Sequence, residues 1–167
     1  SYQFSREQQD AYAVASLERA GKAGKDGSFA EEIAPVKVKT RKGETTIAID
    51  EQPGKAQIDK IPTLKPAFRD GGTVTAANSS SISDGAAAVT MMRRSEAEKR
   101  GLKPIATIIG HATHASTPGL FPSAPVGSIN RLLERIGWSA GDVDLWEVNE
   151  AFAVVAMIAM RDLGIPH

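Results

Sequence analysis

Cysteine is absent from the 167 residues, which excludes a disulfide framework and any metal site built on thiolates. An excess of one charge is also missing. Twenty basic residues balance twenty acidic ones, which argues against a dominant nucleic-acid or anionic-membrane partner. No apolar run reaches the roughly 18 residues that a membrane span needs, and residues 151–160 come nearest. The first residues lack the basic and apolar regions of a signal peptide, so we expect a cytoplasmic protein.

The composition is that of an ordinary globular protein, with 41% apolar and 24% charged residues. From residue 73 onward, helical patterns alternate with apolar strand-like runs, which predicts a layered α/β architecture. Residues 86–92 fit a helix or a strand equally well. The predicted strands cover residues 73–77, 105–110 and 143–148, and the predicted helices about 95–100, 126–136 and 151–160.

A helix is also predicted near the beginning of the chain. Ser5 and Gln8 have the spacing of a capping box, in which each residue caps the backbone of the other. Apolar residues at helical spacing continue the pattern over about residues 6–20, and Gly21 and Gly24 are the expected stop.

A β-hairpin and a long loop are expected next. Residues 32–49 alternate apolar and polar side chains around a turn, which predicts a hairpin with one wet face. Residues 50–72 are rich in proline and glycine and should form an irregular loop, a kind of segment that often carries binding sites. From Val36 to Arg69 there are eight basic residues against four acidic ones. This excess fits either a solvated face or a rim that attracts a phosphorylated ligand.

Residues 143–153 combine an apolar strand pattern, a polar pair and the start of a buried helix. The polar pair is Asn149 and Glu150. In α/β sheets, ligands bind at the edge where strands end, so the pair has either a structural or a chemical role. Asn149 could cap the helix while Glu150 complements its dipole. Alternatively, the amide takes part in chemistry.

Two histidines, His111 and His114, suggest a metal or acid-base site at first sight. Their spacing is unremarkable, and no carboxylate or third ligand lies nearby in the sequence. We therefore interpret them as surface or loop residues and expect no metal site.

Several short motifs follow one another along nearly the whole chain. They are Ser5-Arg6-Glu7-Gln8-Gln9-Asp10-Ala11-Tyr12, Lys65-Pro66-Ala67-Phe68, Gly72-Thr73-Val74-Thr75-Ala76-Ala77-Asn78-Ser79-Ser80, Asp84-Gly85-Ala86-Ala87-Ala88, Gly137-Trp138, Asp142-Val143-Asp144-Leu145 and Asn149-Glu150-Ala151-Phe152-Ala153. Each motif is weak alone, but together and in this order they strongly resemble the thiolases (acetyl-CoA acetyltransferases and 3-ketoacyl-CoA thiolases).

The resemblance implies a thiolase-like layered α/β/α fold, present only in part, and Claisen chemistry on acyl-CoA thioesters. It implies that Asn149 holds a water that stabilises the enolate oxygen, and that Ser80 contacts the pantetheine arm of coenzyme A. Leu64, Ala67, Phe68 and Ala76 match positions that line the coenzyme A site, and Phe121 falls near the acyl pocket. Coenzyme A or acetyl-CoA is then a substrate, and no covalently bound cofactor is implied.

The chain also departs from the thiolase pattern. It lacks both catalytic cysteines and the Gly-His-Pro motif, and His111 and His114 match no catalytic histidine. Gly54 stands where the family usually has an arginine near the coenzyme A phosphates, and Lys55 is a possible substitute. We therefore expect an internal segment of a longer, oligomeric thiolase that is inactive alone.

The resemblance divides the chain into three parts. Residues 1–72 correspond to the loop region, 73–118 to the end of the N-terminal core domain and 119–167 to the start of the C-terminal core domain. Two other hypotheses stay open. The chain could be a catalytically inactive coenzyme A-binding or assembly module of the same fold, or a generic α/β domain with accidental matches.

Overall fold

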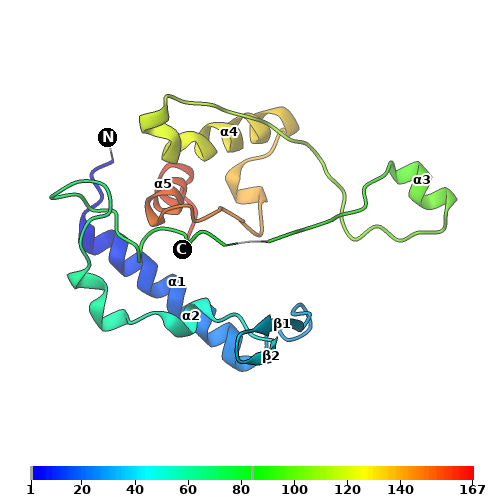
Figure 1. Cartoon of the computed structure of the whole chain (residues 1–167). Helices are drawn as coiled ribbons and strands as arrows, with labels where there is room; N and C mark the ends of the chain where they lie inside the picture. Colours follow the sequence, from blue (N-terminus) through cyan, green and yellow to red (C-terminus); the bar gives the residue numbers. More distant parts are fainter. Residues whose placement is uncertain (1, 84) are drawn as a thin grey trace. The chain divides into compact units, whose positions relative to one another are not determined.

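The computed structural model describes residues 2–83 and 85–167 and divides into two compact units (Figure 1). The first unit runs to Ser80 and includes Ala151–Val154, and the second comprises Ser81–Glu150 and Val155–His167. Asp84, which belongs to one of the thiolase-like motifs, lies outside the described residues.

Helix α1 (Arg6–Asp26) is the longest element of the first unit. The predicted capping box is confirmed: the Gln8 amide donates to Ser5 Oγ at 3.2 Å, and the Ser5 amide donates to Gln8 Oε1 at 2.9 Å. The predicted end at Gly21 or Gly24 is wrong, since a glycine inside a helix costs only about 1 kcal/mol. The helix ends at Gly27, whose φ of 83° is left-handed and favours glycine.

The β-hairpin is confirmed as strands β1 (Val36–Thr40) and β2 (Gly43–Ile47), which pair antiparallel with Val36 opposite Ile47. Every strand residue is exposed, so the prediction of a single wet face is wrong. Two strands alone have no second layer to bury a face, and such a hairpin contributes little stability.

The expected loop over residues 50–72 contains two short helical elements. They are α2 (Gln52–Lys55) and the 3-10 helix η1 (Ile58–Thr63). Ile61 of η1 is the one buried residue of the two elements. The segment is therefore more ordered than its proline and glycine content predicts.

Helices dominate the second unit. The elements are α3 (Arg94–Lys99), η2 (Pro118–Ser123), α4 (Ala124–Ile136), η3 (Ala140–Asp142) and most of α5 (Ala153–Leu163). The three helices predicted in this half of the chain are confirmed with small shifts of their ends, and residues 86–92 adopt neither helix nor strand. The predicted burial of α5 is confirmed from Val155 to Ala159. None of the helices in residues 2–83 and 85–167 has the length and apolar character needed to span a bilayer.

The three predicted strands are wrong. The hairpin is the only sheet in the described part of the chain, and residues 73–77, 105–110 and 143–148 have no strand partner there. Ile105 is fully exposed and Leu145 is 79% exposed, although both belong to apolar runs. A strand needs a neighbouring strand for its backbone hydrogen bonds, so an apolar pattern alone does not produce one.

The glycines of α1 provide a test of why the helix ends at Gly27. Gly24→Ala should raise the free energy of unfolding by about 0.5–1 kcal/mol, because the helix gains propensity and a Cβ at this position meets nothing within 4 Å. Gly27→Ala should lower it by about 1 kcal/mol, because the Cβ of alanine is strained in the left-handed conformation. Urea unfolding followed by circular dichroism measures both. Equal effects of the two substitutions would contradict this account.

Candidate functional site

A buried asparagine organises the turn that contains the predicted coenzyme A contacts. Asn78 is 3% exposed. Its Oδ1 accepts from the Thr75 amide at 2.8 Å, and its Nδ2 donates to Asp10 Oδ1 and to the Thr73 carbonyl, both at 3.0 Å. These bonds satisfy both ends of the amide, and they fold residues 73–78 into a turn in place of the predicted strand.

Asp10 extends this network along α1 to η1. Its Oδ2 accepts from Arg6 Nε at 2.6 Å, and the same guanidinium donates to the Ile61 carbonyl at 2.8 Å. Asp10 is 7% exposed, so its charge needs a partner of this kind. Gln9, also buried, donates to Thr73 Oγ1 at 2.9 Å. The network therefore fixes the turn and η1 to one side of α1.

The same turn binds the segment that precedes α5. The Asn78 carbonyl accepts from the Ala153 amide at 2.9 Å. The Ala151 carbonyl accepts twice from Ser80, from its amide at 3.1 Å and from its hydroxyl at 3.0 Å. Ser79 and Phe152 form an isolated antiparallel bridge. Two of the thiolase-like motifs, far apart in the sequence, are thus joined by their backbones.

The five predicted coenzyme A contacts all belong to the first unit. Ser80, Ala67 and Ala76 are exposed, Leu64 is half-buried, and Phe68 is 75% exposed. The Phe68 ring meets Phe152 edge to face with centroids 6.2 Å apart, and the Ala67 amide donates to the Val74 carbonyl at 2.8 Å. The accessible surface therefore includes the Phe68 ring and the Ser80 hydroxyl. Because that hydroxyl donates its proton to the Ala151 carbonyl, its oxygen can still accept a hydrogen bond.

The two remaining predicted site residues, Asn149 and Phe121, belong to the second unit. Asn149 is exposed and lies outside any helix or strand, and Phe121 is 48% exposed in η2. The capping interpretation of the polar pair is wrong: α5 begins only at Ala153, and its first turn contains no acidic residue. Asn149 is therefore an accessible amide without a helix-capping role.

Both histidines lie in an irregular segment outside any helix or strand, as predicted. His111 is exposed, as expected. His114 is only half-buried as a residue, but its Nδ1 is buried and has no hydrogen-bond partner. Its ring packs on α4 at Gly127, where a Cβ would lie 2.4 Å from His114 Cδ2. Among the described residues, no three histidine, aspartate or glutamate side chains gather as a metal site would require.

The eight basic residues between Val36 and Arg69 are all exposed to solvent. Lys55, the possible phosphate contact, pairs with Glu51 at 2.6 Å, and Lys37 pairs with Glu44 at 3.4 Å. Each of these four side chains is at least half exposed, so the two pairs contribute little stability. The exposure fits both interpretations of the segment and does not separate them.

Three exposed carboxylates have a pKa below the ordinary range. The Ser139 amide and then its hydroxyl lower the pKa of Asp142, and the Ser28 hydroxyl and then its amide lower that of Asp26. A backbone amide and then the Ser5 hydroxyl lower the pKa of Glu7. All three lie at helix ends and none belongs to the predicted site, so these shifts reflect capping.

Four residues that build the site have no predicted role of their own: Arg6, Asp10, Asn78 and Phe152. All four lie inside the thiolase-like motifs, so the motifs marked the right segments. The bond between Asp10 and Asn78 joins residues 68 positions apart. No pattern within a single sequence indicates such a pair.

Comparison with known proteins identifies the family. Residues 1–95 match the family model described as the thiolase N-terminal domain, and residues 102–167 match the thiolase C-terminal domain. The chain therefore belongs to the thiolase family. It is 46% identical over 164 residues to the acetyl-CoA acetyltransferase of Paracoccus denitrificans, covering 98% of this chain and 42% of that protein. A probable acetyl-CoA acetyltransferase of Dictyostelium discoideum is 47% identical over 167 residues, with 99% and 40% covered.

Solved structures confirm the predicted fold class. The acetyl-CoA acetyltransferase of Bacillus anthracis superposes with a TM-score of 0.90 at 37% identity, covering 99% of this chain and 42% of that structure. Human mitochondrial 3-ketoacyl-CoA thiolase gives a TM-score of 0.84 at 35% identity, with the same coverage. The chain thus has part of the α/β thiolase fold and spans about two fifths of the length of these relatives.

A negative charge in place of the buried Asn78 amide should strongly destabilise the first unit. Asn78→Asp places a second carboxylate about 3.0 Å from Asp10 Oδ1. We expect the free energy of unfolding to fall by at least about 2 kcal/mol at pH 7, because a donor is lost and two like charges face each other. The pKa of the introduced carboxyl should rise in the folded state, so part of the stability returns as the pH falls through that raised value.

Urea unfolding at pH 7 and pH 5 measures this effect, with Asn78→Ala as the control. The alanine variant also loses the hydrogen bonds but adds no charge, so its loss of stability should change little between the two pH values. A similar pH dependence in both variants would show that repulsion at Asp10 is not the cause.

Proposed function

We propose that the chain is the part of an acetyl-CoA C-acetyltransferase that contacts coenzyme A and supplies one group of the oxyanion site. The parent enzyme would catalyse reversible Claisen condensation and thiolysis of acetoacetyl-CoA or a 3-ketoacyl-CoA. The observation that supports this most is the double hydrogen bond from Ser80 to the Ala151 carbonyl. It joins the segment of the proposed pantetheine contact to the segment that contains Asn149.

Each proposed role suits the chemistry of the side chain. A neutral amide at Asn149 can orient a water towards a developing oxyanion without adding a charge that must be desolvated. Ser80 contacts the pantetheine arm, and Leu64, Ala67, Phe68 and Ala76 line the coenzyme A surface. Phe121 lies near the acyl pocket. We propose neither a metal nor a covalently bound cofactor.

The chain has no thiol to accept an acyl group or to exchange a proton, so we propose that it is inactive alone. The same absence supports an alternative, a coenzyme A-binding or assembly module that kept the fold without the chemistry. The flanking coding sequence separates the two. An upstream cysteine together with downstream Gly-His-Pro and Cys-Gly-Gly-Gly motifs favours the enzyme.

The remaining proposals follow from the family. The parent would be a cytoplasmic homo-oligomer, a dimer or tetramer, that acts in fatty acid metabolism and binds neither nucleic acid nor membrane. The division at residues 72 and 118 also stays a proposal. The neutral composition is compatible with the absence of a nucleic-acid or membrane partner, and the proposed location is compatible with a relative named as a cytosolic acetyl-CoA acetyltransferase of the mouse.

Binding of coenzyme A by the purified chain tests the proposed contacts. Ser80→Ala should weaken binding about fivefold, the effect of losing one hydrogen bond of about 1 kcal/mol. Isothermal titration calorimetry with coenzyme A gives the affinity. Ser81→Ala is the matched control: this exposed neighbour bonds only to Ser83 among the interactions of the described part, so its loss should leave the affinity unchanged.

Two outcomes would contradict the proposal. Equal affinities of the two serine variants would remove Ser80 from the contact surface. Turnover of acetoacetyl-CoA by the chain alone would show chemistry that needs no cysteine and would overturn the assigned mechanism.

A further inference from the structure

Two arginines of α4 are anchored to the backbone of residues 110–114. Arg131 Nη1 donates to the Thr113 carbonyl and Arg135 Nη1 donates to the His111 carbonyl, both at 2.9 Å. Residues four apart lie on one face of a helix, so both side chains leave α4 in the same direction. One hydrogen bond to the backbone fixes the end of each long side chain, which a free surface arginine lacks.

Close packing on both sides of these bonds sets the distance between α4 and the segment. A Cβ at Gly110 would lie 3.0 Å from Leu132 Cδ1, and a Cβ at Gly127 would clash with the His114 ring. The two glycines therefore let the backbones approach each other. The guanidinium groups are held between two packed contacts and not on a free loop.

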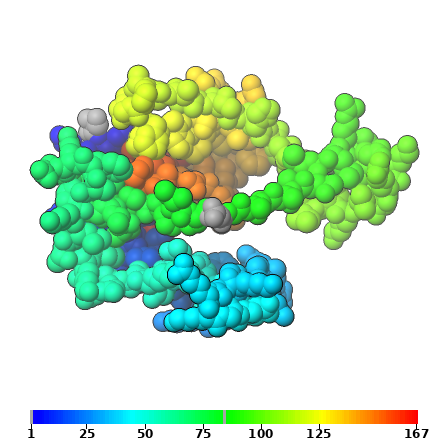
Figure 2. Space-filling view, viewed as in Figure 1, coloured from blue at the N-terminus to red at the C-terminus, as the bar shows by residue number. Residues whose placement is uncertain are grey.

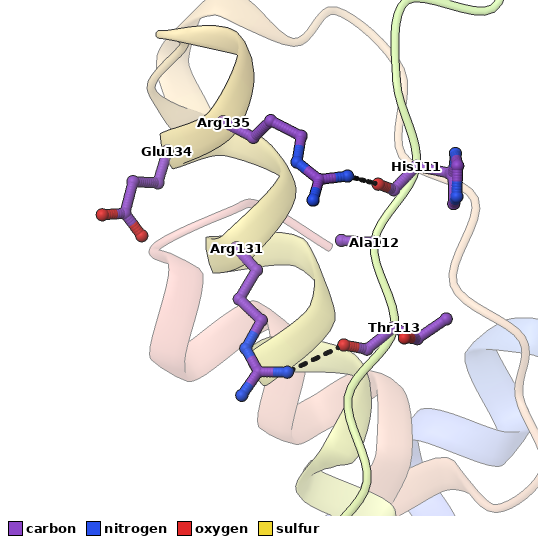
Figure 3. A pocket seen from close by; sticks show the side chains of 6 residues that line it. All are labelled: His111, Ala112, Thr113, Arg131, Glu134 and Arg135. Atoms are coloured by element: carbon purple, nitrogen blue, oxygen red, sulfur yellow. Dashed lines mark hydrogen bonds between the residues drawn. The ribbon is translucent and has the colours of Figure 1, made fainter.

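An open groove of about 640 Å³ lies between α4 and this segment. Figure 3 shows both guanidinium groups reaching across it, with the small side chain of Ala112 between the two bonds. The Glu134 carboxylate extends away from both guanidinium groups in the same view. The negative charge nearest in the sequence is therefore directed away from the arginines. The groove is lined by His111, Ala112, Thr113, Arg131, Glu134 and Arg135.

The positive charge of Arg131 and Arg135 is not compensated within the described residues. No carboxylate there forms an ion pair with either guanidinium. A guanidinium has five N–H donors and stays charged at any physiological pH, so most of the donors of each arginine remain available. Both residues are exposed, and Figure 2 shows atoms of α4, in yellow, on the visible surface. Fixed, accessible and uncompensated cations of this kind attract an anion.

The spacing of the two guanidinium groups selects the shape of that anion. The carbonyls that they bind are two residues apart, which corresponds to about 6.6 Å in an extended chain. A group placed midway therefore has a guanidinium on each side. A carboxylate has two oxygens in one plane and is suited to a single guanidinium fork. A tetrahedral anion can direct oxygens to both sides, and a phosphate group carries about two negative charges to match two arginines.

We propose that Arg131 and Arg135, the arginine pair of α4, bind a phosphate group in this groove. Each guanidinium keeps its bond to the backbone and donates its free N–H groups to the oxygens of the anion. The small side chain of Ala112 leaves the space between them open. The site belongs to the second unit, whereas the five proposed coenzyme A contacts belong to the first, so the proposal does not depend on those contacts.

Titration of the chain with inorganic phosphate tests the site directly, by isothermal titration calorimetry at constant ionic strength. Arg131→Gln combined with Arg135→Gln should weaken binding at least about tenfold, because charge-assisted hydrogen bonds are lost. Arg100→Gln is the matched control. It removes the same charge from an exposed arginine of the same unit, but this arginine pairs with Glu96. Its affinity should be unchanged. Equal weakening by both, or no saturable binding by the unaltered chain, would overturn the proposal.

Lysine substitutions separate the geometry of the arginine pair from its charge. Arg131→Lys combined with Arg135→Lys keeps both positive charges but removes the planar fork, so phosphate binding should weaken several-fold. The same titration measures it. An affinity equal to that of the unaltered chain would show that charge alone attracts the anion, which contradicts the proposed arrangement.

Chemical protection tests the unaltered chain, so it does not depend on how a substitution affects α4. Phenylglyoxal modifies accessible guanidinium groups, and mass spectrometry of peptides gives the rate at each arginine. Saturating phosphate should slow modification of Arg131 and Arg135 several-fold and leave Arg100 unaffected. Absence of protection, or equal protection of all three arginines, would overturn the proposal.

Coenzyme A also carries phosphate groups, so the phosphate titration is repeated with saturating coenzyme A. An unchanged phosphate affinity supports a site for free phosphate or a small phosphate ester. Competition that disappears in the Arg131→Gln and Arg135→Gln variant supports a site for a phosphate of coenzyme A. Competition that survives in this variant would place the phosphate elsewhere and overturn the proposal.

Discussion

The buried hydrogen-bonded network of Asn78, Asp10 and Arg6 is the constraint on which the first unit depends. The Asn78 amide is buried against the Asp10 carboxylate of α1, and each has its partners within the chain. A buried polar group left without a partner costs about 1–3 kcal/mol, and more if it is charged. The turn at residues 73–78 and the carbonyl of Ile61 cannot move independently of α1 without creating such a group.

This network holds the backbone of the candidate site in place. Asn78 fixes the turn by its side chain and receives the Ala153 amide at its carbonyl, so the residues before α5 follow the turn. Ser80 and Phe68 then meet Ala151 and Phe152. A polar interior thus positions the accessible surface on which we propose that coenzyme A binds.

The elements that the sequence predicts well are those with local causes. The capping box of α1 and the hairpin turn depend on residues within a few positions of each other. The wrong predictions depend on distant partners. Residues 105–110 and 143–148 have strand character, but a strand forms only beside another strand. Asp10 and Asn78 are 68 residues apart, so no local pattern joins them.

The two units differ in how completely their polar groups find hydrogen-bond partners and their apolar side chains are buried. The polar network of the first unit closes within the described chain, since the Asn78 amide and the Asp10 carboxylate both have partners there. The second unit buries α5 but leaves Ile105, Ile108 and Leu145 in solvent. Local sequence and global packing normally agree in a complete fold. Their disagreement at these residues distinguishes the second unit from the first, in which the buried polar groups have partners. The five proposed coenzyme A contacts all belong to the first unit, whereas the proposed oxyanion residue Asn149 belongs to the second.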